Sequence, residues 1–513
     1  SSDSQNFADL YYRGYGEIGF RLNPSLSINA VGGYQSFLCS GSPAVLSGPF
    51  AGISLRITGS VGANAKKSAI DIKVVQESDV FPVFSTVYAN EPFGSILIQN
   101  DEGAELRDVH VSFRAGKYTT ELKECGSVAR INRHSSVEIP LYANFSSDIL
   151  NFTENGKISA EIVVDYEFLG KKMSTVEPVI ISVYNRNAFI WSDAASLAAF
   201  ISPDSQELSA FAKEIIGITR ANLYTGMNAN LQYAIGIIEG LKLAGINYSG
   251  DTVTPFVDYY STYDLDSIQY PLQTLQYLSG DYDDLGILVC SCLQIVDVPT
   301  GYIATPDDFL VLVKLNMSPS QVLNNFESDE GLLLDKEADE VYMALSMKNL
   351  EKGFTKSFEA GREAIVRCFE DEENYYEFVD TVDAWTVYKP ATYSNGSFVD
   401  TPKQEELLKN INAAINQYIS SDINVVIDRA RTSGDANRLG VALIRAGRFT
   451  EAKSAFTKAA NAGSVSAMNN VANILMIEKN YTAAAAQYRK VLEKSPNNSI
   501  AIKGLENATS KIE

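Results

Sequence analysis

The stretch that decides the fold of the middle of this chain reads Ile268-Gln-Tyr-Pro271 and then Gly280-Asp-Tyr-Asp-Asp-Leu285. Two further segments follow it, Pro299-Thr-Gly301 and Thr305-Pro-Asp-Asp-Phe309. The acidic segment runs directly into the apolar residues 285–289, so it is predicted to form the start of a central helix. The change from strand-like alternation to helical periodicity comes earlier in the chain, at Asn187-Ala-Phe-Ile-Trp191.

These segments, in this order, resemble the central motif of bacterial transglutaminase-like proteins, which have a papain-related cysteine fold. The family motif reads Tyr-Pro-x-x-Thr-Leu, then Gly-Asp-Cys-Asp-Asp-Leu, then Thr-Pro-Gly-His. Upstream, Leu241, Gly245 and Tyr248 also match. The resemblance spans about residues 190–365 and implies a degenerate transglutaminase-like α+β domain over residues 188–400.

The resemblance also identifies the positions of the family's catalytic residues. The family's nucleophile is a cysteine whose thiol pKa is lowered by the helix N-terminus and a histidine, and an acidic residue orients the histidine. Here the cysteine's place holds Tyr282, the histidine's place Asp308 and the acid's place Ser346. A tyrosine hydroxyl has a pKa of about 10, and a carboxylate repels a thiolate. We therefore expect no catalytic residue but a vestigial cleft, that is, a pseudoenzyme.

A nearby cysteine offers little replacement for the missing nucleophile. Cys290 lies eight residues after Tyr282 on the same predicted helix, among apolar neighbours. Such an environment raises the pKa of a thiol and makes it inert. The chain has only two histidines, His110 and His134, and both precede the motif in a strand-rich region.

The acidic side chains Asp281, Asp283, Asp284 and Asp307 surround this vestigial cleft if the family fold holds. Two roles are open to them. Carboxylate oxygens are ligands for Ca²⁺ or Mg²⁺, whereas in the family fold such acids cap the start of the helix. Their spacing matches no EF-hand loop, so helix capping is the expected role, with no metal and no cofactor.

The N-terminal part alternates in the period of β-strands. Residues 1–62 are predicted to form a β-hairpin or meander, and their alternating glycine and tyrosine resemble strands of an outer-membrane β-barrel. An ordinary meander packed on the next domain is the other interpretation. Residues 69–187 contain about seven short strand patterns, which is typical of an immunoglobulin-like β-sandwich.

The C-terminal part, residues 401–513, is predicted to be helical and contains an internal repeat. Leu439-Gly440 and Phe449 with Ala452 recur about 32 residues later as Val471-Ala472 and Tyr481 with Ala484. The pattern resembles the tetratricopeptide repeat, in which small residues let paired helices approach closely. The expected fold class is therefore multidomain α+β: strands and an Ig-like sandwich, a degenerate transglutaminase-like domain, then helical repeats.

Composition limits the possible partners. The chain has 513 residues and a net charge of −21, which argues against nucleic acid and anionic membrane surfaces as partners. Its five cysteines form neither a disulfide framework nor a zinc pattern. No apolar run is long enough for a membrane helix.

These patterns favour a non-catalytic interaction or scaffolding protein of the bacterial cell envelope. The expected partner is a protein or peptide, bound through the tetratricopeptide repeats or the vestigial cleft. Two alternatives remain: a cryptic, cysteine-independent amide-bond hydrolase or transferase, and a component of an outer-membrane-associated assembly that residues 1–62 would join. The expected location is periplasmic or at the outer membrane, and this follows from the resemblance.

Overall fold

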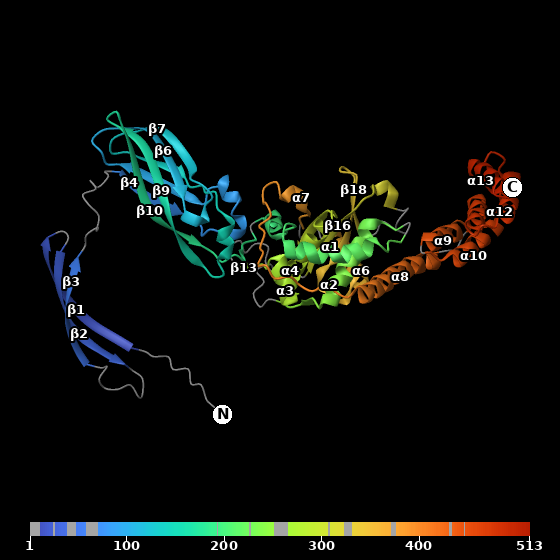
Figure 1. Ribbon diagram of the computed structural model, residues 1–513, viewed down its shortest axis with the longest axis horizontal. Coiled ribbons are helices and arrows are strands. Elements are labelled where there is room, and N and C mark those ends of the chain that lie inside the picture. Colours follow the sequence, from blue (N-terminus) through green and yellow to red (C-terminus); the bar gives the residue numbers. More distant parts are fainter. Residues whose placement is uncertain are drawn as a thin grey trace, which may run out of the picture. The chain divides into compact units, whose positions relative to one another are not determined.

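The computed structural model describes residues 11–23, 26–37, 48–57, 70–191, 193–224, 227–250, 265–305, 308–322, 331–370, 376–429, 433–445 and 447–512. The chain divides into two compact units, Ser1–Ala69 and Ile70–Glu513 (Figure 1). Strands dominate towards the N-terminus and helices form the C-terminal stretch, which confirms the expected mixed α and β class. The finer assignment of each part to a known domain type remains a prediction.

The first unit contains a three-stranded antiparallel sheet. Its strands are β1 Tyr11–Asn23, β2 Leu26–Phe37 and β3 Gly48–Ile57, paired in the order β1-β2-β3. The register aligns Gly16 with Gly32 and Gly32 with Ala51, so the three strands present the same alternation to each face.

The second unit begins with two antiparallel sheets that share one core. The four-stranded sheet has the order β10-β9-β6-β7, and the three-stranded sheet has the order β4-β5-β8. The strands are β4 Ile70–Gln76, β5 Gly94–Asn100, β6 Leu106–Arg114, β7 Lys123–Ile131, β8 Ser136–Pro140, β9 Gly156–Phe168 and β10 Lys171–Val183. Alternate residues such as Ile96, Val111 and Ile162 are buried between the sheets, as the period-two pattern requires.

The central part is built on an antiparallel sheet of five strands in the order β17-β18-β16-β15-β19. Their bounds are β15 Thr300–Thr305, β16 Asp308–Leu315, β17 Leu332–Asp335, β18 Glu340–Ser346 and β19 Val379–Asp380. The helices of this part are α1 Gln206–Arg220, α2 Ala229–Ala244, α3 Pro271–Tyr277, α4 Tyr282–Gln294, α6 Phe354–Glu370, α7 Thr381–Ala384 and α8 Gln404–Arg429.

Helices cover both faces of this sheet (Figure 1). One face buries Val311 and Met343 in the same core as α1, α2 and α4. The other face buries Leu312 and Ala344 with Ile365 of α6. Strands that are apolar on both faces fit such a three-layer arrangement, and β16 is buried along almost its whole length.

The first half of α8 packs into this central core as well. Leu407, Ile411 and Ile415 are buried there, and Tyr418 lies edge-on to Phe358 of α6. Residues that we expected within the C-terminal helical region thus complete the core of the preceding part.

The C-terminal stretch is a row of helices in which each contacts the next. They are α9 Ser433–Arg445, α10 Phe449–Asn461, α11 Val465–Ile477, α12 Tyr481–Lys494 and α13 Ser499–Ser510. Two glycines in these helices pack against aromatic rings. A Cβ added to Gly440 would lie 2.4 Å from the Phe456 ring, and one added to Gly504 would lie 2.3 Å from the Tyr488 ring. Small residues at these two places therefore allow the helices to approach.

Within the described residues, none of the helices combines the length and the apolarity that crossing a bilayer demands.

The close packing of α4 against the sheet can be tested at Gly286. An added Cβ there would lie 2.1 Å from the Phe309 ring, so Gly286→Ala should destabilise the central part by about 1–3 kcal/mol. On α1, Gly217 has nothing within 4 Å of an added Cβ, so Gly217→Ala should stabilise it by about 0.5–1 kcal/mol.

Urea unfolding followed by tryptophan fluorescence measures both changes. Trp191 and Trp385 are the chain's two tryptophans and both pack against the central core, so the signal reports this part. Equal effects of the two substitutions would contradict the packing described for α4.

Candidate functional site

The candidate site is built around the first turn of α4. Asp281 is the N-cap residue, and one of its carboxylate oxygens accepts a hydrogen bond from the N–H of Asp284 at 3.3 Å. Gly280 precedes it because a Cβ there would lie 2.6 Å from the Cβ of Asp284. The helix therefore begins at the acidic segment, as predicted.

A short parallel pairing brings a second tyrosine to this turn. Strand β12 (Asn247–Tyr248) pairs with β14 (Ser279–Gly280), which places Tyr248 beside the start of α4. The rings of Tyr248 and Tyr282 stack with centroids 4.5 Å apart and planes 13° apart. Burial, followed by a hydrogen bond with Tyr282, raises the pKa of Tyr248 to about 12. The phenol of Tyr248 is therefore protonated at neutral pH.

The positions of Asp308 and Ser346 meet across two paired strands. Asp308 begins β16 and Ser346 ends β18, and the register pairs Leu310 with Ser346. The Ser346 hydroxyl donates to Oδ2 of Asp308 at 2.5 Å. The N–H groups of Phe309 and Lys348 donate to Oδ1 at 2.8 and 3.0 Å. Both side chains are buried, so the Asp308 carboxylate is held in place by three donors.

Lys348 links this pair to the two tyrosines. Its backbone N–H binds Asp308, and its ammonium group is close enough to lower the pKa of Tyr248, against the larger effect of burial. The structure thus brings Asp308 and Ser346 into direct contact and connects them through Lys348 to the Tyr248–Tyr282 stack.

The acidic residues at the start of α4 lie close together. Oxygen atoms of Asp281, Asp283 and Asp284 lie within 4.8 Å of one another, and all three residues are buried. Gln269 engages both oxygens of Asp284, with its backbone N–H at 2.7 Å and its Nε2 at 2.6 Å. The backbone N–H of Asp284 also donates to Asp283 Oδ1 at 2.8 Å. Asp307 lies outside the described residues.

Burial raises the pKa of Asp283 well above its ordinary value, and a hydrogen bond with the Asp281 carboxyl raises it further. Burial and the nearby Asp281 charge also raise the pKa of Asp284, although the Gln269 bonds act in the opposite direction. Two carboxyl groups that share a hydrogen bond must share a proton. The cluster can therefore hold a proton at a pH where exposed carboxyl groups are ionised.

The cysteines of α4 are enclosed in the core. Cys290 and Cys292 are fully buried, and burial raises the pKa of the Cys290 thiol to about 12 and that of Cys292 further. A thiol with such a pKa carries almost no thiolate at neutral pH.

The structure gives His110 partners that sequence spacing did not suggest. His110 lies on β6, where Nδ1 is 2.9 Å from Glu124 of β7 and Nε2 is 3.2 Å from Asp108. The group is exposed, and the hydrogen bond with Glu124, followed by the one with Asp108, raises its pKa. Cross-strand pairing produced the contact between His110 and Glu124, and the sequence gives no direct sign of that contact.

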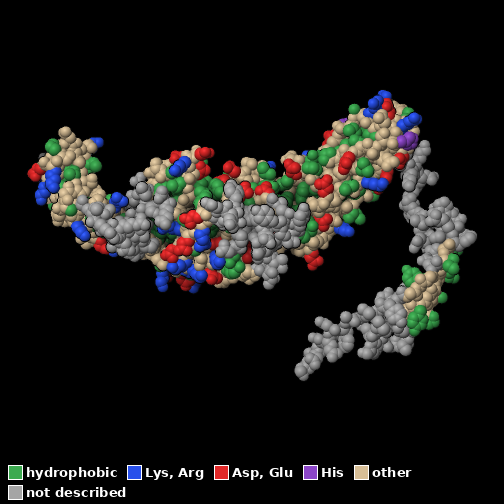
Figure 2. Space-filling view, turned by 180° about the vertical axis from the view of Figure 1, so that it is seen from behind, with side chains coloured by type: hydrophobic (Ala, Val, Ile, Leu, Met, Phe, Trp, Pro, Cys, Tyr) green, Lys and Arg blue, Asp and Glu red, His purple; other side chains and the backbone are tan. Residues whose placement is uncertain are grey.

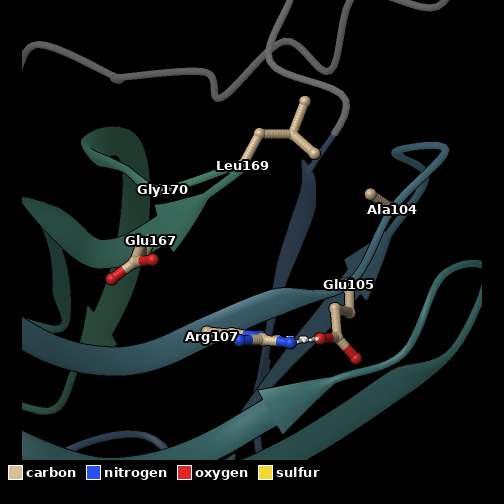
Figure 3. Close-up of a pocket in the computed structure, with 6 residues that line it drawn as sticks. All are labelled: Ala104, Glu105, Arg107, Glu167, Leu169 and Gly170. Carbon is tan, nitrogen blue, oxygen red and sulfur yellow. Dashed lines mark hydrogen bonds and ion pairs between the residues drawn. The ribbon is translucent and has the colours of Figure 1, made fainter.

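A shallow pocket lies in the strand-rich part, away from the first turn of α4 (Figure 3). Its lining residues are Ala104, Glu105, Arg107, Glu167, Leu169 and Gly170. The Nε–H of Arg107 donates a hydrogen bond to Glu105 at 2.6 Å. These two side chains form an ordinary surface ion pair. This pocket offers no nucleophile or acid–base pair.

Sequence reasoning missed three contributors to the site. Tyr248 was part of the quoted motif without a role, and Lys348 and Gln269 act through contacts across elements.

Compared with known proteins, the chain matches no protein-family model and has no significant match among curated protein sequences.

The proton held by Asp283 should make the stability of the central part pH-dependent. A carboxyl group with a raised pKa in the folded state binds more protons than in the unfolded chain, so stability falls as pH rises from about 4 towards the folded-state pKa. Asp283→Asn replaces the protonated carboxyl by a neutral amide and should reduce this fall.

Urea midpoints from tryptophan fluorescence at a series of pH values above about 4 measure the effect. Asp400→Asn, in an exposed segment of the same part, is the matched control and should leave the pH profile unchanged. A profile that is identical in wild type and Asp283→Asn would show that Asp283 is ionised in the fold.

Proposed function

We propose that this chain is a non-catalytic interaction or scaffolding protein of the bacterial cell envelope, built on an inactive transglutaminase-like domain. One observation carries the proposal. Asp308 and Ser346, at the places of the family's histidine and acid, are hydrogen-bonded across β16 and β18, while Tyr282 stands at the first position of α4. These positions support the proposed frame of a cysteine acyl-transfer site whose chemical groups have been replaced.

The groups at these places are unsuited to acyl transfer. Formation of an acyl-enzyme needs a nucleophile that is largely ionised or activated by a base. Tyr282 instead stacks on a tyrosine. Asp308, which would have to act as its base, already accepts three hydrogen bonds and is buried. These contacts support a structural role for the cleft residues.

The rest of the second unit supports a role in binding. The two sheets of residues 70–183 share one core, as in an immunoglobulin-like sandwich, and the helices of residues 433–510 pack in consecutive pairs, as in tetratricopeptide repeats. Asparagines of α11 bind side chains of three neighbours: Asn470 donates to Asn437 of α9, Asn469 donates to Asn498, the N-cap of α13, and Asn473 accepts from Tyr488 of α12. We propose that a peptide or protein partner binds this helical stack.

The proposed location is the periplasm or the outer membrane. The support is the resemblance to exported proteins that combine a sandwich with a transglutaminase-like domain. An outer-membrane-associated assembly is the second candidate, and the first unit of the chain favours it, as argued below.

The absence of acyl-transfer activity is directly measurable. The purified protein is incubated with a glutamine-rich protein as acyl donor and a fluorescent primary amine as acyl acceptor, with an active transglutaminase as positive control. We expect amine incorporation at the level of the protein-free blank, in wild type and in both Tyr282→Phe and Cys290→Ser.

The two variants make the assay decisive. Incorporation by wild type that either substitution abolishes would identify a working nucleophile and would refute the pseudoenzyme. Incorporation that survives both substitutions would point to a different site and would equally refute it.

A further inference from the structure

The sheet of the first unit has one entirely apolar face among its described side chains. The antiparallel register places Ile18 of β1 opposite Ala30 of β2, and Ala30 opposite Ile53 of β3. The other residues of this face with described side chains are Gly14, Gly16, Ile28, Gly32, Tyr34, Pro49 and Ala51. Ile18 and Ile53 are 81% and 82% exposed, so nothing in the described chain covers this face. Figure 2 shows hydrophobic side chains, in green, on the described part of this sheet.

The opposite face receives the charged positions of the sequence. The register assigns to it the positions of Arg13, Glu17, Arg21 and Arg56. The apolar face receives, by the same register, the positions of Tyr12, Phe20, Leu26, Leu55 and Ile57, with Ser36 at one end. By register, one face is thus apolar except at Ser36, whereas the other face mixes these charged positions with apolar ones such as Val31 and Phe50.

The strands are also long, and their connections are unequal. β1, β2 and β3 contain 13, 12 and 10 residues, against about 5–6 for an average strand and about 9–11 for one that crosses a bilayer. Two residues separate β1 from β2, whereas ten separate β2 from β3. Membrane-spanning sheets show this alternation of short turns on one side and longer loops on the other.

We propose that β1, β2 and β3 are part of a membrane-spanning sheet whose apolar face contacts the hydrocarbon chains of a lipid bilayer. A protein cover would suit an apolar face of any length. The match of strand length to bilayer thickness, the unequal connections and the segregation of all charges to the other face favour lipid.

Insertion sets a requirement on the edges of the sheet. Among the described residues, the outer edges of β1 and β3 pair with no further strand. Each unpaired backbone group in hydrocarbon costs several kcal/mol, so both edges must pair with further strands of a closed sheet, which other copies of this chain in the same vesicle would supply. β3 ends at the side of the two-residue connection, since Leu26 pairs with Ile57. The chain therefore leaves the bilayer on the short-turn side, opposite to residues 38–47.

The proposal predicts that lipid contact alternates between neighbouring residues of a strand, and this can be tested on the whole chain. The protein is reconstituted into phosphatidylcholine vesicles whose acyl chains are plain or brominated, because bromine quenches tryptophan fluorescence on contact. Ile53→Trp should lose emission in the brominated lipid, whereas Gly52→Trp, one residue away on the other face, should not. The two native tryptophans pack in the core of the second unit and give a constant background.

A second pair protects the test against a variant that fails to fold. Tyr34→Trp and Gln35→Trp are neighbours on opposite faces of β2, and the first alone should be quenched by bromine near the lipid headgroups. Equal quenching within both pairs would overturn the proposal. A chain that stays in the aqueous fraction would also overturn the proposal. This includes a chain that forms a dimer which Ile53→Lys converts to monomers.

Sidedness gives an independent measurement. One protease site is inserted within residues 38–47 and a different one within residues 58–69. In sealed vesicles each chain should be cut at one site or the other from outside, and doubly cut chains should appear only after detergent is added. Doubly cut chains in sealed vesicles would overturn the proposal. These outcomes do not depend on whether the cleft at Tyr282 is active.

Discussion

The burial of α4 between its two terminal residues is the constraint on which the second unit's central part depends. Its residues from Asp283 to Leu293 are all buried, although the helix begins with two carboxyl groups. Buried carboxyl groups must be hydrogen-bonded or protonated. Asp281 caps the helix and Gln269 binds Asp284, while burial raises the pKa of Asp283 well above its ordinary value. These contacts tie the segments around Gln269 and β12 to the helix start, and they bring Tyr248 against Tyr282.

The same constraint shapes what the cleft can do. An N-terminal helix position favours an anion, and in the resembling family a thiolate uses it. Here a stacked tyrosine stands at that position, and Asp308 is held by Ser346 and two backbone N–H groups. The carboxylate of Asp308 is thereby hydrogen-bonded, whereas Oε1 of Gln269 is buried without a hydrogen-bond partner among the described residues. The arrangement suits a packing or recognition surface better than a reaction centre.

The sequence predicted the elements that depend on local pattern, and missed those that depend on contacts between distant segments. The acidic start of α4 and the helices near Phe456 both carry local signals. The resemblance assigned Asp308 and Ser346 to the family's histidine and acid positions, but their hydrogen bond was not predicted because it requires the β16–β18 register. The remaining features depend on tertiary contacts and burial. They are the roles of Lys348 and Gln269, the packing of Tyr418 with Phe358 and the raised pKa of Asp283. The local sequence pattern does not indicate these tertiary contacts.

The most direct test of the central claim restores the family's groups and measures a thiol pKa. Tyr282→Cys alone and Tyr282→Cys with Asp308→His are alkylated with iodoacetamide across a pH series, and mass spectrometry follows the modification of position 282. If position 282 lies at the helix N-terminus beside position 308, the double variant should titrate below the ordinary thiol pKa of about 8.5 and below the single variant, which keeps the repelling carboxylate. Identical midpoints in the two variants would show that these positions do not form a relic of a cysteine site.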